Sequence, residues 1–394
     1  MSGVSEHVVI VGAGQGGLQA AMSLRTEGFT GRISLIGEEP GLPYQRPPLS
    51  KAYLKTGAAD ALTLRPAAFF EKHDITLVTG TRVDSIVRDT GHVLLGSKTL
   101  GYDHLILATG TRNLRPPIDG LEHALDLRTL EDAKRLRKEL DRPRTCAVIG
   151  AGFIGLEFAA VARALGHKVT VAEAAQRPMA RAVSSPIAAR FAEMHLQMGT
   201  RLCFGQAVKE VDETGIHLPD GEKIDADLIL LAAGVRPNVE LAQAAGLPCD
   251  NGIVTDAQLQ TADPAISALG DCAVFPDPRT GRLVRLESVQ AATDHARTIA
   301  KRITHGTATP YAAVPWFWSD QSDLKLQIAG LAFPEDDCIE CENGSVLRFD
   351  GDALTAAETI NNPKVHMKAR KILALQAPPG RDTLKRAGYD LTLI

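Results

Sequence analysis

No apolar run in this sequence is long enough to cross a membrane. Runs such as residues 228–235 fall far short of the roughly 20 residues that a transmembrane helix needs. The first core strand is expected to begin by Val8, which leaves no room for a signal peptide before it. We therefore expect a cytoplasmic protein that has no membrane partner.

The sequence also lacks an excess of charge of either sign. Its 43 basic residues are matched by 47 acidic ones, which gives a formal net charge of −4. A protein that binds nucleic acid or anionic lipid through its overall charge needs a basic excess, so we expect neither partner. A chain of 394 residues, 44% of them hydrophobic, is instead long enough for two or three domains with cores of their own.

Cysteine is scarce, with six residues and none before Cys146. Their scatter through apolar segments suits buried thiols better than a disulfide framework. Cys338 and Cys341 form a CxxC pair, but the pair falls in an expected strand without a helix N-terminus to lower a thiol pKa. A zinc site would need two further ligands, and only His366 lies nearby in sequence. We expect no metal site, and a redox or metal role for the pair is the alternative.

A glycine pattern near the N-terminus organises the chain. Residues 8–11 are apolar and run into a GxGxxG turn, after which apolar residues recur at helical spacing. A second apolar run, residues 33–36, follows and leads to Glu38. The pattern predicts strand, tight turn, helix and strand. The turn glycines are Gly12, Gly14, Gly16 and Gly17.

These glycines have separate physical tasks. Gly12 makes the turn, Gly14 lets the backbone approach a pyrophosphate, and Gly17 lets helix and strand pack closely. The helix N-terminus can then hold the diphosphate with unpaired N–H groups and its dipole. Glu38 can accept hydrogen bonds from both hydroxyls of an adenosine ribose. The segment therefore predicts a dinucleotide site.

The pattern occurs a second time from Cys146. Residues 146–149 predict a strand, a GxGxxG turn follows, a helix runs through Leu165, and a strand from Val169 ends at Glu173. Two copies, each with an acid at the strand end, predict two bound dinucleotides. The residues of the second turn are Gly150, Gly152, Ile154 and Gly155.

The acid of the second copy bears on the choice of coenzyme. A carboxylate at Glu173 hydrogen-bonds ribose hydroxyls and repels a 2′-phosphate, so NADH is expected. Arg177 and Arg181 lie near enough in sequence to keep NADPH as the alternative, since an arginine can accommodate that phosphate.

Three further stretches accompany the two copies. Residues 40–51 form a proline-stiffened loop that presents Arg46 and Lys51 beside the first dinucleotide, the alternative being a solvated surface loop. A buried strand over residues 105–107 ends in a turn of small residues that admits a flat cofactor close to the backbone. Gly234 opens a turn that closes the second copy, and Asp271 follows a strand end where it could hold the polyol of an extended flavin. The turn after residue 107 is Ala108, Thr109 and Gly110, and Asp271 is preceded by Gly270.

Together these motifs resemble those of a known family. The twin fingerprints, the ATG turn at 108–110, the GVRPN turn at 234–238 and the GDCA stretch at 270–273 are similar to those of two-dinucleotide flavoprotein reductases of glutathione-reductase fold. The PPLSK loop at 47–51 and the PWFWSDQ stretch at 315–321 narrow the resemblance to NADH-dependent ferredoxin reductases of the putidaredoxin reductase type. The resemblance covers essentially the whole chain.

The resemblance implies an α/β fold with two Rossmann-like dinucleotide-binding domains and a small C-terminal α+β domain. Residues 1–111 and 236–312 would form a discontinuous FAD-binding domain, residues 112–235 an inserted NADH-binding domain, and residues 313–394 the C-terminal domain. FAD and NADH would be the cofactors.

The resemblance also implies roles for individual residues. Glu157, just inside the second helix, would pair with Lys51 beside the flavin and the nicotinamide. Trp318 would lie between the flavin and the protein surface, the alternative being an indole that fills the core of the small domain. The FAD contacts would come from Gly12, Gly14, Gly16, Gly17, Glu38, Arg46, Lys51, Val83, Arg128 and Asp271, and from Glu287, Ser288 and Val289, whose helix N-terminus would face the flavin.

The implied activity is hydride transfer from NADH to FAD, followed by single-electron transfer to a two-iron two-sulfur ferredoxin that serves a monooxygenase or a ring-hydroxylating dioxygenase. A rubredoxin or quinone reductase, or an apoptosis-inducing-factor-like NADH-responsive binding protein, is the alternative. Disulfide reductases need cysteines against the flavin, and none precedes Cys146, so a thiol relay is not expected. An acidic ferredoxin would dock on a local basic rim. The rim residues would be Arg65, Lys301, Arg302 and Lys325.

Overall fold

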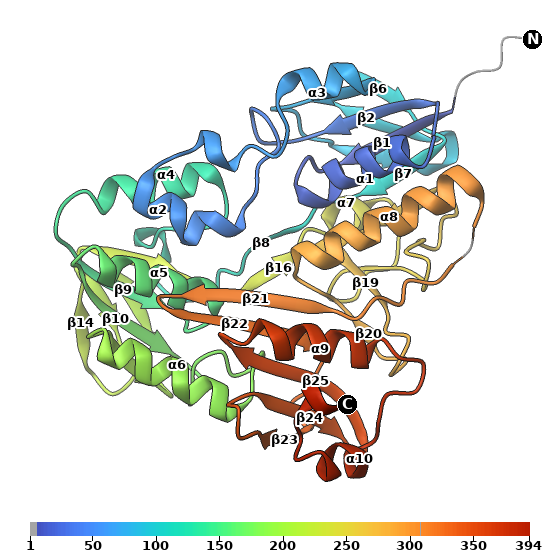
Figure 1. The fold of residues 1–394 in the computed structure, drawn as a ribbon. Coiled ribbons are helices and arrows are strands. Elements are labelled where there is room, and N and C mark those ends of the chain that lie inside the picture. Colours follow the sequence, from blue (N-terminus) through green and yellow to red (C-terminus); the bar gives the residue numbers. More distant parts are fainter. Residues whose placement is uncertain (1–5, 308) are drawn as a thin grey trace, which may run out of the picture. The chain divides into compact units, whose positions relative to one another are not determined.

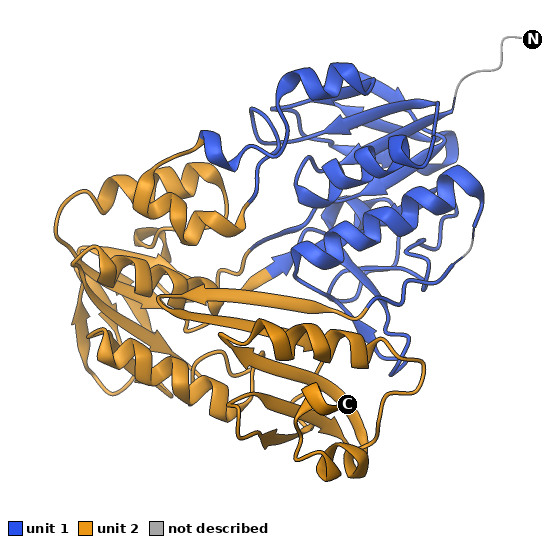
Figure 2. Ribbon diagram, in the orientation of Figure 1, with its two compact units in different colours: residues 1–45, 60–112, 236–313 blue, residues 46–59, 113–235, 314–394 orange. Residues whose placement is uncertain are grey.

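The structure is a computed structural model that describes residues 6–307 and 309–394. Its contacts gather into two compact units, shown in blue and orange in Figure 2. Unit 1 comprises residues 1–45, 60–112 and 236–313, and unit 2 comprises residues 46–59, 113–235 and 314–394. The chain passes between the units within β8 (Thr111–Asn113) and β16 (Val235–Pro237) and at the ends of the other segments. The division into three domains stays a prediction.

Unit 1 is built on a five-stranded parallel sheet in the order β18-β7-β1-β2-β3, of which β7, β1 and β2 are labelled in Figure 1. Every residue of the central strand β1 is buried, as expected for a parallel strand that is covered on both faces. Helices α1 and α8 lie side by side in this unit. The strands are β1 (His7–Val11), β2 (Arg32–Ile36), β3 (Ile75–Val78), β7 (His104–Leu107) and β18 (Ile266–Ala268), and the two helices are α1 (Gln15–Thr26) and α8 (Val289–His305).

Two small sheets and short helices complete unit 1. Buried side chains of the antiparallel sheet β4-β5-β6 join the core of the main sheet, among them Val93. The elements are β4 (Ser85–Val87), β5 (His92–Leu95), β6 (Lys98–Gly101), β17 (Ile253–Val254), β19 (Ala273–Pro276), β20 (Leu283–Val284), α3 (Ala67–Lys72), α7 (Glu240–Ala244), and the 3-10 turns η2 (Asp60–Leu62), η3 (Arg88–Thr90) and η5 (Gly270–Cys272).

Unit 2 contains a second parallel sheet, in the order β11-β10-β9-β15. Its strands alternate with helices along the chain, which is the pattern of a Rossmann-like domain. The elements are β9 (Thr145–Ile149), α5 (Phe153–Ala164), β10 (Lys168–Glu173), α6 (Ser185–Gln197), β11 (Arg201–Phe204) and β15 (Leu228–Leu231), with η1 (Pro47–Ser50), α2 (Ala52–Thr56), η4 (Leu121–His123), α4 (Leu130–Glu139), and the hairpin strands β12 (Glu210–Asp212), β13 (Gly215–His217) and β14 (Lys223–Asp225).

The C-terminal part of unit 2 is an antiparallel sheet in the order β21-β22-β25-β24-β23, with α9 packed on it (Figure 1). Phe349 and Leu347 of this sheet are fully buried beneath Val365 and Ala369 of α9. The elements are β21 (Trp316–Gln321), β22 (Leu324–Gly330), β23 (Asp337–Glu340), β24 (Val346–Asp350), β25 (Ala353–Ile360), α9 (Pro363–Leu373), α10 (Arg381–Arg386) and η6 (Leu391–Leu393).

The α/β fold class with two Rossmann-like sheets and a C-terminal α+β part is confirmed. The strands expected at residues 8–11, 33–36, 105–107 and 146–149 all form, and the helix expected to run through Leu165 ends at Ala164. The expectation of a strand through Cys341 is wrong, because β23 ends at Glu340 and Cys341 opens a turn closed by Ser345. Among the helices described, none combines the length and the apolar character needed to span a bilayer.

Candidate functional site

The first glycine turn joins β1 to α1. Gly12 has φ +112°, and a Cβ there would lie 2.1 Å from the carbonyl oxygen of Ala108, so only glycine fits. A Cβ on Gly17 would lie 1.8 Å from the carbonyl oxygen of Gly12, and one on Gly16 would meet Leu269. These three glycines therefore serve the turn and the close packing of its helix.

The second glycine turn, between β9 and α5, is built in the same way. Gly150 has φ +107°, and a Cβ there would lie 2.4 Å from the carbonyl oxygen of Ala232. A Cβ on Gly155 would lie 2.2 Å from the carbonyl oxygen of Gly150. Ile154, in contrast, is 40% exposed. An exposed isoleucine beside the second glycine turn offers apolar surface to a ligand.

The middle glycine of each turn behaves differently. A Cβ added to Gly14 or to Gly152 would meet nothing within 4 Å. Each is the N-cap of its helix, and neither helix has a side-chain cap, whereas Thr129 caps α4 and Ser288 caps α8. Uncapped N–H groups facing open space are what a diphosphate requires. Both turns therefore fit a dinucleotide.

The acids that follow the two turns have different surroundings. Glu38, after β2, is exposed and forms an ion pair with Arg82 at 3.2 Å. Glu173 ends β10, and its carboxylate accepts the backbone N–H of Ala151 at 2.7 Å and that of Ala175 at 2.8 Å. Glu173 is thus fixed against the second glycine turn and retains lone pairs for ribose hydroxyls.

Arg177 and Arg181, the two arginines that could accommodate the 2′-phosphate of NADPH, differ from each other in their contacts. Arg177 donates to the backbone carbonyls of Val183 and Ala180, each at 2.9 Å. This guanidinium therefore braces its own loop. Arg181 is exposed and lies near Gly234, which has φ +108°.

The small-residue turn after β7 lies against the first glycine turn. Ala108 contributes the carbonyl that excludes a side chain at Gly12, and Gly110 has φ +64°. The Thr109 hydroxyl donates to the carbonyl of Asn238 at 2.7 Å, and the Asn238 amide donates back to the carbonyl of Thr109 at 2.8 Å. This pair of side chain-to-backbone hydrogen bonds fixes the turn in unit 1.

A third part of unit 1 surrounds Asp271. The Thr111 hydroxyl donates to its carboxylate at 3.2 Å, and the N–H of Gly270 donates to Nδ1 of the buried His295 at 3.2 Å. Burial lowers the pKa of His295 to about 3, so the ring is neutral and can accept this bond. Further along, Ser288 caps α8 through the N–H of Ala291. Glu287 precedes this cap and pairs with Arg285 at 2.7 Å, and Val289 is the first helical residue.

Lys51 and Glu157 meet inside unit 2. Lys51 Nζ lies 2.6 Å from Glu157 Oε2, and Glu157 is only 3% exposed. The Ser50 hydroxyl donates to the same oxygen at 2.5 Å, and the Ser319 hydroxyl donates to Oε1 at 2.7 Å. Phe153 is the first residue of α5, and Glu157 lies one helical turn beyond it. The pair is therefore held beside the second glycine turn.

Ser50 and Ser319 were not anticipated from the sequence. Both lie within stretches that carried the resemblance, Ser50 in the proline loop and Ser319 in β21. A serine beside an expected functional lysine or tryptophan is the only signal that could have indicated them.

The remaining expected site residues lie in both units. In unit 2, Arg46 donates to the carbonyl of Arg128 at 2.6 Å, which ties the proline loop to the start of α4. Trp318 is partly exposed in β21 and packs against Trp316, with ring centroids 5.5 Å apart. In unit 1, Val83 is buried in the core beneath the main sheet.

The six cysteines are all free thiols. Burial raises the pKa of Cys146 to about 12 and also raises that of Cys272. Cys338 is exposed and Cys341 is buried. Within residues 6–307 and 309–394, no group of three or more His, Cys, Asp or Glu side chains is arranged to hold a metal ion.

Two residues of the expected basic rim, Arg65 and Arg302, are partly buried. Arg302 is partly buried on α8 and donates to the Ser267 hydroxyl, and burial lowers its pKa. The expectation for Arg302 is therefore wrong, because this face of α8 packs on the sheet. Arg65 is partly buried with its guanidinium 5.5 Å from the ring centre of Phe69, whereas Lys301 and Lys325 are exposed.

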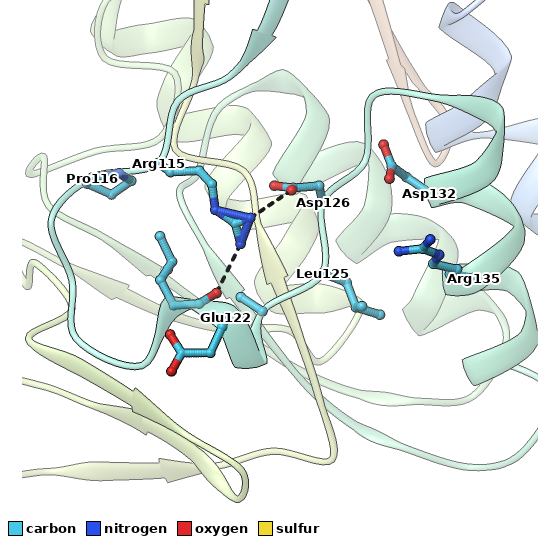
Figure 3. Close-up of a pocket in the computed structure, with 9 residues that line it drawn as sticks. Arg115, Pro116, Glu122, Leu125, Asp126, Asp132 and Arg135 are labelled. Carbon is cyan, nitrogen blue, oxygen red and sulfur yellow. Dashed lines mark hydrogen bonds and ion pairs between the residues drawn. The ribbon is translucent and has the colours of Figure 1, made fainter. Parts of the chain in front are cut away.

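A separate cavity of about 570 Å³ lies in unit 2 beside α4 (Figure 3). Arg115 reaches across it to the Asp126 carboxylate at 3.0 Å and the Leu121 carbonyl at 3.1 Å. Its lining carries three carboxylates and two guanidinium groups, so it favours neither an anion nor a cation. Asp132 belongs to the capping box of α4. No expected site residue lines it.

Comparison with known proteins agrees with this geometry. The family described as pyridine nucleotide-disulphide oxidoreductase matches residues 6–296, and a family described as reductase C-terminal matches residues 316–393. Rhodocoxin reductase from Rhodococcus erythropolis is 46% identical over 98% of this chain and 93% of its own length. Putidaredoxin reductase from Pseudomonas putida is 38% identical over 95% of this chain and 93% of its own length.

Solved structures agree as well. A ferredoxin reductase from Rhodopseudomonas palustris matches with a TM-score of 0.94 at 44% identity and covers 98% of this chain and 99% of its own. The reductase in a covalent complex of putidaredoxin reductase with putidaredoxin matches with a TM-score of 0.93 at 36% identity and 98% coverage of both chains. The resemblance inferred from the motifs is thereby confirmed. The match over residues 6–296 and relatives of this identity over nearly the whole length show that the chain belongs to the pyridine nucleotide-disulphide oxidoreductase family.

Proposed function

We propose that this protein is an FAD-containing reductase that takes a hydride from NADH and passes single electrons to a two-iron two-sulfur ferredoxin. The observation that carries the proposal is the pair of glycine turns, each with an uncapped helix N-terminus and open space at its middle glycine. Two such turns suit one resident and one exchanging dinucleotide. Relatives named as rhodocoxin reductase, putidaredoxin reductase and a ferredoxin reductase component of the p-cumate dioxygenase system support the acceptor.

The residues of unit 1 suit the adenosine and polyol parts of FAD. The first turn offers N–H groups to the diphosphate, Glu38 offers a carboxylate to the ribose, and Asp271 offers one to the polyol. Bound flavin would supply the redox chemistry, because it can accept a hydride and release electrons one at a time.

The residues of unit 2 suit NADH. Glu173 would bind the ribose hydroxyls and disfavour a 2′-phosphate, while the second turn holds the diphosphate. Lys51 and Glu157 would serve the reacting ends of the two cofactors, since a lysine beside a flavin stabilises negative charge on the reduced ring. Trp318 would lie at the route of electrons to the acceptor. The other expected contacts, which would bind FAD, are Arg46, Val83, Arg128, Glu287, Ser288 and Val289.

An acidic ferredoxin would be attracted by exposed cations such as Lys301 and Lys325. A rubredoxin is the second candidate acceptor, because a rubredoxin-NAD(+) reductase from Pseudomonas putida is 39% identical over 91% of this chain. Six free thiols suit a reducing compartment, and we propose that the protein works in the cytoplasm.

Reconstitution with NADH and purified acceptors tests the proposal. The protein is expected to be purified with one FAD per chain, to be reduced by NADH faster than by NADPH, and then to reduce a two-iron ferredoxin faster than a rubredoxin or a quinone. A folded protein that takes up no FAD would refute the flavoprotein assignment. Faster reduction of rubredoxin would retain the flavoprotein and replace its acceptor.

A further inference from the structure

A line of buried polar side chains leads away from Glu157 through unit 2. Ser319 Oγ lies 2.7 Å from Glu157 Oε1, and Gln321 Nε2 lies 3.2 Å from Ser319 Oγ. Gln321 Oε1 lies in turn 3.0 Å from His195 Nε2. Ser319, Gln321 and His195 are each 0% exposed. Such a line is costly to bury unless every member has a partner.

The local structure explains how these residues meet. Side chains alternate along a strand, so Phe317, Ser319 and Gln321 share one face of β21. Phe153 and Glu157 are four residues apart on α5 and therefore share one face of that helix. The rings of Phe317 and Phe153 pack with centroids 4.6 Å apart, next to the bond between Ser319 and Glu157. One strand of the C-terminal sheet thus packs on the helix of the second glycine turn.

The donors and acceptors give the line a direction. Glu157 receives Lys51 and Ser50 on Oε2, an arrangement that suits an ionised carboxylate, so Ser319 must donate its single proton to Oε1. Ser319 can then only accept from Gln321, whose second N–H faces the sulfur of Met179 at 3.6 Å.

The far end of the line is fixed by the same reasoning. With its N–H groups directed at Ser319 and Met179, Gln321 turns its carbonyl oxygen to His195, which must carry its proton on Nε2. Nδ1 of His195 is buried and has no hydrogen-bond partner in the described part of the chain. Burial lowers the pKa of His195, which agrees with a neutral ring. Every proton in the line therefore points toward Glu157.

We propose that Ser319, Gln321 and His195 are positioning residues that hold the Glu157 carboxylate in place for Lys51. The proposal rests on the proposed function, in which Lys51 and Glu157 serve hydride transfer from NADH. The C-terminal sheet then has a task in the reaction: it supplies the donors that orient an acid on the NADH side. Glu157 acts on the cofactors, and the other three act through it.

Stopped-flow reduction of the FAD-loaded full-length protein by NADH tests the proposal. Ser319→Ala is expected to slow flavin reduction at saturating NADH by about tenfold, the effect of losing one hydrogen bond to a charged group, with FAD content unchanged. Ser319→Thr keeps the hydroxyl and is expected to retain most of the rate. Ser345→Ala is the matched control, because Ser345 is also buried, at 2% exposed, and its side chain bonds only within its own turn, just before β24 of the same sheet.

A double-mutant cycle separates positioning from structural support. Gln321→Leu is expected to slow flavin reduction in the wild-type background and to have no further effect when Glu157→Gln is already present. Effects that add in the double mutant would overturn the proposal, because a residue that acts through Glu157 cannot act without it. Wild-type rates in Ser319→Ala and Gln321→Leu would overturn it as well, while leaving the proposed function intact.

The direction of the line has a readout that does not depend on turnover. Nitrogen NMR of the full-length protein labelled at histidine is expected to show His195 protonated on Nε2 alone, and Gln321→Leu is expected to remove this preference. An Nδ1-protonated or fully protonated ring in the wild type would overturn the proposal. Failure of the wild type to be reduced by NADH would refute the proposed function instead. The NMR measurement would then still test the direction of the hydrogen bonds from His195 to Glu157.

Discussion

At the scale of single residues, the Glu173 carboxylate fixes a turn and, in the function proposed, would also favour NADH over NADPH. Each of its oxygens accepts one backbone N–H, from Ala151 and from Ala175. A carboxylate oxygen can accept more than one bond, so the ribose hydroxyls of NADH can still be bound. A 2′-phosphate would instead meet a fixed negative charge. Arg177 does not offset that charge, because its guanidinium is bound to backbone carbonyls.

The first prediction concerns Glu173→Ala. The variant is expected to bind NADH more weakly by about 1 to 3 kcal/mol, since hydrogen bonds to a charged group are lost. The dependence of the stopped-flow rate of flavin reduction on NADH concentration gives the apparent NADH dissociation constants that check this. Glu38→Ala is the paired control, which is expected to weaken FAD and leave NADH binding unchanged. Wild-type enzyme that used NADPH as well as NADH would show that Arg181 outweighs Glu173.

The second prediction concerns Lys51→Met. The change leaves a buried carboxylate without its cation, so flavin reduction by NADH is expected to slow by about tenfold or more. FAD content is expected to stay close to that of the wild type. Lys55→Met is the control, because Lys55 is an exposed lysine on the adjacent helix α2. Equal rates for the two variants would assign Lys51 to structure alone.

At the scale of elements, the two glycine-turn helices separate packing from binding. Gly12 and Gly17 are needed because neighbouring backbone oxygens occupy the place of a side chain. Gly14 and Gly152 face open space, so their missing side chains leave room for something outside the fold. The same short motif therefore contains residues that serve stability and residues that serve the ligand.

The third prediction compares Gly14→Ala with Gly12→Ala. Gly14 has φ −82°, so alanine is expected to cost no more than about 1 kcal/mol of unfolding free energy while its methyl group weakens FAD binding. Gly12→Ala is expected to cost more than about 1 kcal/mol, because φ +112° and the Ala108 carbonyl oppose a Cβ. Denaturant unfolding of the FAD-free protein and FAD titration measure the two effects. A Gly14→Ala variant with unchanged FAD affinity would place the diphosphate elsewhere.

The fourth prediction concerns the anchoring of β25. Glu358 is 1% exposed, pairs with Arg348 at 3.1 Å, and accepts the N–H and the hydroxyl of Ser184. Glu358→Ala leaves a buried guanidinium without its counter-ion and is expected to lower the free energy of unfolding by about 3 to 5 kcal/mol.

Glu340→Ala is the matched control for Glu358→Ala. Glu340 lies in the same sheet and also pairs with an arginine, Arg190, but both side chains are partly exposed. Its loss is expected to cost no more than about 1 kcal/mol. Tryptophan fluorescence follows both variants, because the two tryptophans of the chain lie in β21. Equal losses would mean that burial does not strengthen the Glu358 pair.

At the scale of the whole molecule, the thiols are separate from the chemistry proposed. Five of the six cysteines have a pKa raised chiefly by burial, which keeps them as unreactive thiols at neutral pH. The fifth prediction is that a variant with all six replaced by alanine is reduced by NADH at the wild-type rate, with some loss of thermal stability from the buried positions. Stopped-flow reduction and thermal unfolding measure the two effects. Loss of NADH oxidation with FAD still bound would indicate a thiol relay.

The sequence alone determined the local architecture. Apolar runs, glycine spacing and helical periodicity act within about ten to thirty residues, so strand, turn and helix could be placed around Gly12 and Gly150. The same motif spacing predicted the acid that follows the second strand of each copy, Glu38 in the first and Glu173 in the second. The family also followed, because its motifs are short and contiguous.

The surroundings of Glu157 follow instead from the packing of segments that are distant in sequence. Ser50 and Ser319 approach its carboxylate from more than 100 residues away on either side in sequence. A serine, a glutamine or a histidine has no local pattern that marks it as buried beside a distant acid, since its partner is chosen by packing. The structure likewise shows that Arg302 is partly buried, because the orientation of α8 on its sheet directs that side chain to Ser267. The local spacing of apolar residues and glycines determines which helices and strands form. The packing of those elements decides which polar side chains hydrogen-bond to one another.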